Sequence, residues 1–159
     1  MLVLALVAVA APGQSATLRV SDPAGDGTGP GLDITSLRVN NADYVLVVRV
    51  RFVRAVHGDL VTFVRTRQGM LAAVVSEHLA SGDATTLTTV AGETTCAGLR
   101  TVWDHAADVA VVTVPSRCLR GGNYGALKVR VLTEIGQDAD LAPKTAEGAW
   151  RWTRLVPRG

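Results

Sequence analysis

The chain has 159 residues, a length that suits one domain and leaves little room for two well-packed ones. Hydrophobic residues make up 48% and charged residues 19% of the sequence, a balance too apolar for a disordered chain. The formal charge is only +2, and the basic residues are almost all Arg, which is not the footprint of a nucleic-acid-binding protein. We therefore expect one folded domain without a nucleic-acid partner.

The first sixteen residues, MLVLALVAVAAPGQSA, form an uncharged apolar run followed by small residues and a Pro-Gly break. This pattern is typical of the apolar and cleavage regions of a secretory signal, and the run is too short to span a bilayer comfortably. The charged start of a complete signal is missing near Met1, and a buried N-terminal strand or helix is the alternative. We expect residues 1–16 to direct secretion, and residues 17–159 to form one extracellular domain without a membrane span.

Beyond this segment, apolar residues alternate with polar ones between turn residues, which indicates strands and not helices. In the clearest stretch, 44–54, one face carries Tyr44, Leu46, Val48, Val50 and Phe52. We expect a first strand directly after the export segment, and a short helical turn at 116–119. The other predicted strands are 35–39, 44–54, 59–67, 70–78, 84–90, 99–103, 109–114, 126–135 and 150–156. These eight or nine short strands after the first, depending on whether 150–156 is one, predict an all-β protein, an antiparallel two-sheet β-sandwich of jelly-roll type.

The chain has two cysteines, Cys96 and Cys118, and neither belongs to a CxxC motif or a cluster of zinc ligands. In an exported chain, two such cysteines are more often paired than free. A Cys96–Cys118 bond would close a loop of about twenty residues, worth roughly 3 kcal/mol in the chain-entropy model. We therefore predict one structural disulfide.

A glycine-rich loop at 22–34 contains three carboxylates, Asp22, Asp26 and Asp33, just before a predicted strand. Glycine lets the backbone curl so that oxygen atoms can converge on a hard cation such as calcium. The alternative is that the aspartates cap turns by accepting backbone N–H bonds. Asp138 and Asp140 could approach the same sheet end, but another turn is the simpler interpretation. The loop therefore predicts a possible structural calcium site, without the spacing of an EF-hand.

Several short motifs carry a resemblance: DPAGD and LDITSLRV near the start, CAGL, VWD and VPSRCL in the middle, and DADLAP and WRWTRLVPRG near the end. In these the chain resembles small exported actinobacterial proteins of unknown role. The opening loop and strand order more distantly resemble family-nine carbohydrate-binding modules and DOMON-like sandwiches. The distant resemblance implies a jelly-roll sandwich, structural calcium and, in some members, sugar binding.

No motif for catalysis is found: there is no G-x-S-x-G elbow, P-loop or G-x-G-x-x-G. Ser76, Glu77 and His78 are triad-type residues, but neighbours in a strand point to opposite faces. The three histidines, His57, His78 and His105, lack the close spacing of zinc sites, and surface positions are expected for them. We therefore predict that the protein is not an enzyme.

Two further groups could bind a ligand. Trp150 and Trp152 share a face if the tail is extended, where they could stack on a sugar or pack against a sheet. Arginines at 49, 51, 65 and 67 could form a basic stripe across two paired strands, or a solvated face crossed by carboxylates. We predict a binding module for an extracellular glycan or cell-surface polymer; a structural or inhibitory domain that binds a protein is the alternative.

Overall fold

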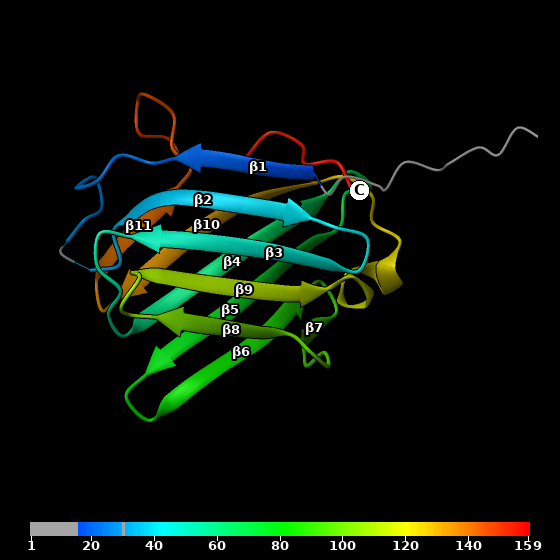
Figure 1. Ribbon diagram of the computed structural model, residues 1–159, viewed down its shortest axis with the longest axis horizontal. Coiled ribbons are helices and arrows are strands. Elements are labelled where there is room, and N and C mark those ends of the chain that lie inside the picture. Colours follow the sequence, from blue (N-terminus) through cyan, green and yellow to red (C-terminus); the bar gives the residue numbers. More distant parts are fainter. Residues whose placement is uncertain (1–15, 30) are drawn as a thin grey trace, which may run out of the picture.

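The protein is an antiparallel β-sandwich, as the sequence predicts, here in a computed structural model that describes residues 16–29 and 31–159 (Figure 1). One sheet contains, in spatial order, β1 (Ala16–Ser21), β2 (Ile34–Asn41), β3 (Val45–Phe52), β9 (Val109–Pro115) and β8 (Arg100–Asp104). The other contains β11 (Asp138–Ala142), β10 (Leu127–Ile135), β4 (Gly58–Thr66), β5 (Leu71–Leu79), β6 (Gly82–Thr89) and β7 (Gly92–Thr94). Apart from Ala16, the predicted secretory segment 1–16 lies outside the described residues.

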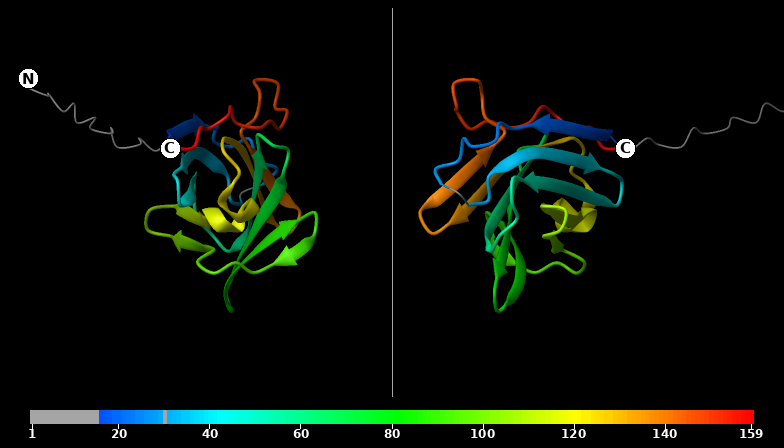
Figure 2. Two further views of the ribbon diagram at one scale, coloured as in Figure 1. Left: turned by 90° about the vertical axis from the view of Figure 1, so that its right-hand side faces the viewer. Right: turned by 60° about the vertical axis from the view of Figure 1, so that its left-hand side comes forward.

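The hydrophobic core lies between the two sheets, which Figure 2 shows as two facing layers. The alternation predicted for 44–54 is confirmed from Leu46 onward, because Leu46, Val48, Val50 and Phe52 are all at most 2% exposed. Tyr44 was expected on this face, but it precedes β3 and is 86% exposed. The apolar side of β3 therefore faces the opposite sheet, as in other sandwiches.

The described residues form eleven strands, more than the eight or nine expected, and the difference lies partly at the C-terminus. Asp138 and Asp140, expected in a turn, belong to β11, which lies beside β10. The predicted strand 150–156 is wrong, because this tail makes only isolated bridges, Lys144 to Trp150 and Leu127 to Val156. The hydroxyl of Thr153 accepts a hydrogen bond from the backbone N–H of Val129. A side chain therefore replaces the backbone carbonyl that a regular strand would supply.

The two ends of the sandwich carry different chemistry (Figure 1). At one end, on the left of the figure, lie the loop 22–33, the β3–β4 connection and the turn between β8 and β9; we call it the acidic end. At the other lie η1 (Ser116–Cys118), η2 (Arg120–Gly122) and the C-terminus; we call it the disulfide end. The candidate sites sit at these ends and on the outer faces of the sheets.

Candidate functional sites

The loop 22–33 connects β1 to β2 and is fixed by Asp140 of β11, in the opposite sheet. Asp140 is 3% exposed, and its Oδ2 accepts the backbone N–H of Ile34 at 2.7 Å. The hydroxyl of Thr28 both donates to the carbonyl of Ala139 and accepts the N–H of that residue. These contacts join the two sheets across the acidic end, so the loop lies directly over the edge of β11.

Three carboxylates converge beneath this loop, and they differ in one member from the three that the sequence predicts, because Asp140 stands in place of Asp33. Asp22, Asp26 and Asp140 each place one oxygen within 4.8 Å of the others, so together they could hold a metal ion. Asp33 instead accepts the N–H of Gly25 at 2.7 Å, which is the turn-fixing role. Asp138 lies against Gly29, where an added Cβ would stand 2.0 Å from the carboxylate, so only glycine fits there without a shift.

A lysine, which the sequence reasoning missed, already supplies positive charge to this cluster. The ammonium of Lys144 lies 2.7 Å from Oδ1 of Asp140 and 3.0 Å from Oδ2 of Asp26. Burial lowers the pKa of Lys144, but hydrogen bonds and attraction from both carboxylates outweigh it, and the net pKa is raised. Lys144 lies four residues after Asp140, but its contact with Asp26 depends on the loop 22–33 lying over β11, which the sequence does not show.

The third member of the cluster, Asp22, has a raised pKa. Burial, together with the nearby charges of Asp26 and Asp140, raises its pKa to about 6, against lowering effects of a backbone hydrogen bond and the charge of Lys144. Its Oδ2 is buried and has no hydrogen-bond partner among the described residues. The donor set consists of oxygens only, which suits a hard cation, although the lysine occupies part of the same space.

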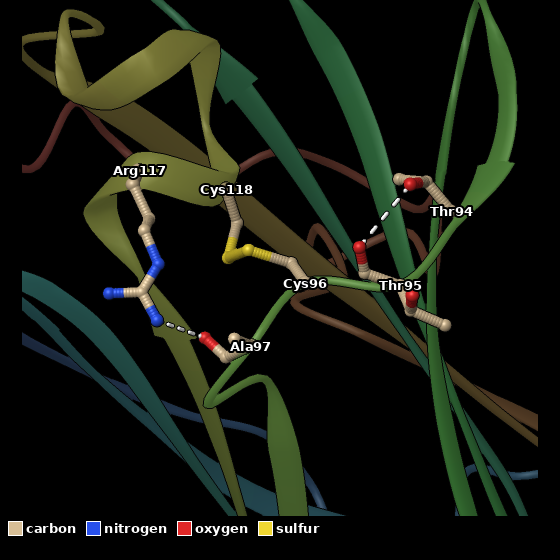
Figure 3. Close-up of a disulfide and its surroundings, with 6 residues drawn as sticks. All are labelled: Thr94, Thr95, Cys96, Ala97, Arg117 and Cys118. Carbon is tan, nitrogen blue, oxygen red and sulfur yellow. Dashed lines mark hydrogen bonds between the residues drawn. A yellow bond between two sulfur atoms is a disulfide. The ribbon is translucent and has the colours of Figure 1, made fainter.

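The predicted disulfide is present at the disulfide end (Figure 3). Cys96 precedes β8 and Cys118 ends η1, and the two are 22 residues apart in the sequence. The guanidinium of Arg117 donates to the carbonyl of Ala97 at 2.5 Å beside the bond. A disulfide is compatible with an oxidising, extracellular environment.

The structure brings Trp150 and Trp152 together, with a cation between them. The guanidinium of Arg130, on the outer face of β10, lies 3.7 Å from the ring centre of Trp150 and 4.4 Å from that of Trp152. Phe63 of β4 meets Trp150 edge-on, with ring centres 5.4 Å apart. The two tryptophans therefore share a face, as predicted, but each has one ring surface against arginine and not against solvent.

The arginines of the predicted stripe lie on two different sheets, because β3 and β4 do not pair. Arg49 and Arg51 are instead joined by Arg19 and Arg38 on the outer face of the five-stranded sheet. Arg19 stands directly opposite Arg38, and Arg38 directly opposite Arg49. The sequence signal was present, since each of β1, β2 and β3 places an Arg between two apolar residues, Leu-Arg-Val or Val-Arg-Val. No carboxylate crosses this face within β1, β2, β3 or β9.

The three histidines, expected at separate surface positions, lie together at the acidic end. His57 belongs to the β3–β4 connection, His78 to β5 and His105 to the turn between β8 and β9. Nε2 of His78 is 2.8 Å from Nε2 of His105, and the ring centre of His57 is 4.7 Å from that of His78. A strand, a turn and a connection far apart in the sequence meet where the two sheets end, so residue spacing gives no indication of this cluster.

Comparison with known proteins gives no family: no protein-family model, no curated protein and no solved structure matches the chain. Among the residues that the structure describes, no helix is long and apolar enough to cross a membrane.

Proposed function

We propose that the protein is an exported, non-catalytic module that binds an anionic glycan through the arginines on the outer face of its five-stranded sheet. The observation that carries this proposal is the row formed by Arg19, Arg38 and Arg49, with Arg51 beside it; we call these four residues the arginine face. The disulfide and the apolar start of the chain support export.

The arginine face gathers positive charge without neutralising it. Neighbouring strands are about 4.8 Å apart, so arginines directly opposite one another repel and destabilise the sheet. All four are exposed, and none of them forms an ion pair with another described residue. An arrangement that costs stability in the free protein is explained if an anionic partner neutralises it.

The shape and chemistry of the face fit a chain of acidic sugars. The four arginines line a shallow groove of about 360 Å³, together with Ser21 and Ser36. Guanidinium groups bind carboxylate and sulfate oxygens in pairs, and serine hydroxyls can hydrogen-bond to sugar hydroxyls. A polymer with an anionic group on each residue could reach several arginines at once, which raises affinity through multivalency.

Affinity electrophoresis or calorimetry with polygalacturonate and heparin tests this proposal, with dextran as the uncharged polymer. The double variant Arg38→Ser/Arg49→Ser should weaken binding at least tenfold, equal to about 1.4 kcal/mol, since it removes two charge-assisted contacts. The matched control is Arg65→Ser/Arg67→Ser, which removes the same charge from the other sheet and should change binding little. Equal losses in both variants would show that net charge, and not this face, attracts the polymer.

Two other results would overturn the proposal. Stronger binding to single-stranded DNA than to either acidic polysaccharide would point to a nucleic acid, against the sequence expectation. Retention of a discrete protein by the wild type, with no binding to either polysaccharide, would favour the alternative of a protein-interaction domain. Trp150→Ala separates a contribution of the aromatic stack from that of the arginine face, because Trp150 packs against Phe63 on the outer face of the other sheet.

We further propose that calcium is the metal that Asp22, Asp26 and Asp140 could hold, in a structural role. Their oxygen-only donor set and the resemblance to carbohydrate-binding modules support calcium, whereas the ammonium of Lys144 competes for two of the three carboxylates. Thermal melts with calcium and with excess EDTA test it. Calcium should raise the melting temperature by a few degrees, and more in Lys144→Met, where the competing charge is gone. No shift in either protein would reduce the loop to turn chemistry and salt bridges.

A further inference from the structure

The histidine cluster at the acidic end has a hydrogen-bond pattern that two neutral imidazole rings cannot satisfy. Nδ1 of His78 lies 2.5 Å from a carboxylate oxygen of Asp83, and Nδ1 of His105 lies 3.0 Å from the carbonyl of Ala55. Both partners are acceptors, so each Nδ1 must carry a proton and donate it. A neutral ring has only one N–H proton, so both Nε2 atoms are left with lone pairs.

These two lone pairs are directed at each other. The Nε2 atoms of His78 and His105 are 2.8 Å apart, a separation at which two acceptors repel unless a cation lies between them. The cation can be one additional proton or a metal ion. His78 is 7% exposed and is packed against Trp103, with ring centres 4.8 Å apart and planes 16° apart, so its ring is held in place.

The surroundings of both rings match those of metal-binding histidines. Histidines that bind metals typically donate their other ring N–H to a carboxylate or a backbone carbonyl, which fixes the ring and directs the free nitrogen at the ion. Asp83 does this for His78, and Ala55 does it for His105. In a tetrahedral site with Zn–N bonds of about 2.0–2.1 Å, two ligand nitrogens are about 3.3 Å apart. The Nε2 atoms therefore need to separate by only about 0.5 Å to admit zinc.

A third imidazole is within reach. His57 is exposed on the β3–β4 connection, and its ring centre lies 4.7 Å from that of His78 and 6.1 Å from that of His105. In the structure its ring lies against the face of His78, tilted by 35°, so this exposed side chain must rotate for one of its nitrogens to reach the ion. Three histidines with water in the fourth position form a common ligand set for zinc.

We propose that His57, His78 and His105 bind a divalent transition-metal ion of the zinc class, distinct from the hard cation that the carboxylates of the loop 22–33 could hold. His78 belongs to the six-stranded sheet, His105 to a turn of the five-stranded sheet, and His57 to the segment that joins the two sheets. A bound ion therefore links the two sheets at the end opposite the disulfide.

Zinc titration of the oxidised, EDTA-treated and desalted protein against a chromophoric chelator tests this proposal, with calcium as a competitor. We expect one equivalent of zinc to bind, without displacement by calcium, because imidazole nitrogen suits zinc and not calcium. His105→Gln should abolish binding, and His57→Gln should weaken it. Asp83→Asn should lower affinity by about 10- to 100-fold, the usual effect of losing the partner that orients a ligand.

Glu77→Gln is the matched control, since Glu77 precedes His78 on β5 and points to the opposite face. It should leave zinc affinity unchanged. His105 is exposed, so His105→Gln tests the site without the folding risk of changing buried His78. Copper gives a second measurement: bound Cu²⁺ should quench the fluorescence of Trp103, and Trp103→Phe should remove most of that quenching. The absence of one-to-one zinc binding, or equal binding by His105→Gln, would overturn the proposal and leave a shared proton between the rings.

Discussion

The two ends of the sandwich are held by different forces. The disulfide end contains the Cys96–Cys118 bond and, apart from it, a buried hydrogen bond between uncharged groups: the hydroxyl of Tyr124 donates to the side-chain oxygen of Asn41 at 3.1 Å. At the acidic end, the corresponding contacts are between charged groups, with Lys144 between Asp26 and Asp140. Contacts of the first kind hardly change with pH or ions, whereas contacts of the second kind respond to both. The disulfide end has one longer ion pair, Arg158–Asp43 at 3.8 Å, so we expect it to respond to pH and ions less strongly than the acidic end.

The largest effect is expected from Asp140→Ala, which removes the centre of the acidic end. This change leaves the buried N–H of Ile34 without a hydrogen-bond acceptor and removes one of the carboxylates that pair with Lys144. Breaking a buried pair from one side typically costs about 3–5 kcal/mol, and we expect a loss of that size in chemical denaturation. Asp138→Ala, on the same strand but outside the triad, should cost about 1 kcal/mol or less. Equal losses in the two variants would contradict the central role of Asp140.

Opening the disulfide should cost somewhat less. The two cysteines are 22 residues apart in the sequence, and the chain-entropy model predicts that closing a loop of this length stabilises the fold by about 3 kcal/mol. The variant Cys96→Ala/Cys118→Ala and the reduced wild type should both lose about this much in denaturant titrations. The loss should be the same at pH 4 and pH 8, because no charged group forms the bond. A strongly pH-dependent loss would show that the two ends are coupled and would break the comparison.

The charge state of Asp22 gives the acidic end a pH dependence of its own. The pKa of Asp22 is about 6 in the folded protein and near 3.8 in the unfolded chain, so the folded state binds the proton more tightly. The stability from this proton is fully present below pH 3.8 and is lost as the pH rises through 6. The loss is at most about 3 kcal/mol, from about 1.4 kcal/mol for each pKa unit.

Comparing Asp22→Asn with the wild type between pH 4 and pH 8 isolates this effect. The neutral amide should leave stability nearly unchanged at pH 4 and make the variant the more stable protein at pH 8. Denaturant titrations at both pH values measure the difference. A variant that is less stable at pH 8 would show that the ionised carboxylate is needed, as expected if it binds calcium.

Local pattern was sufficient for much of the fold. Alternation placed Leu46, Val48, Val50 and Phe52 correctly in the core, because a strand between two sheets must separate apolar from polar residues. The pairing of Cys96 with Cys118 followed from there being only two cysteines. The tail was misinterpreted because its alternating residues make hydrogen bonds through a side chain and isolated bridges, which leave the same pattern as a strand.

The candidate sites were harder to predict, because they depend on which strands become neighbours. The sequence suggested a carboxylate cluster, but Asp140 replaced Asp33 once β11 was placed beside β10. The pairing of β2 with β3 places Arg38 opposite Arg49, whereas Arg65 lies on β4 in the other sheet. Period-two alternation determines the face on which a residue lies, but not the strand that lies alongside, and sites composed of several strands need both.

The start of β1 and the last residue of the chain meet at the same strand. Ala16 stands opposite Asn41 in the β1–β2 pairing, and the backbone N–H of Gly159 donates to the carbonyl of Asn41 at 3.2 Å. A short linker could therefore join Gly159 to Ala16, and new termini could be opened at the exposed β6–β7 turn, where Val90 is 97% exposed. Such a circular permutant would move both chain ends to the edge of the six-stranded sheet. The arginine face and the two ends of the sandwich would keep their strands and connections.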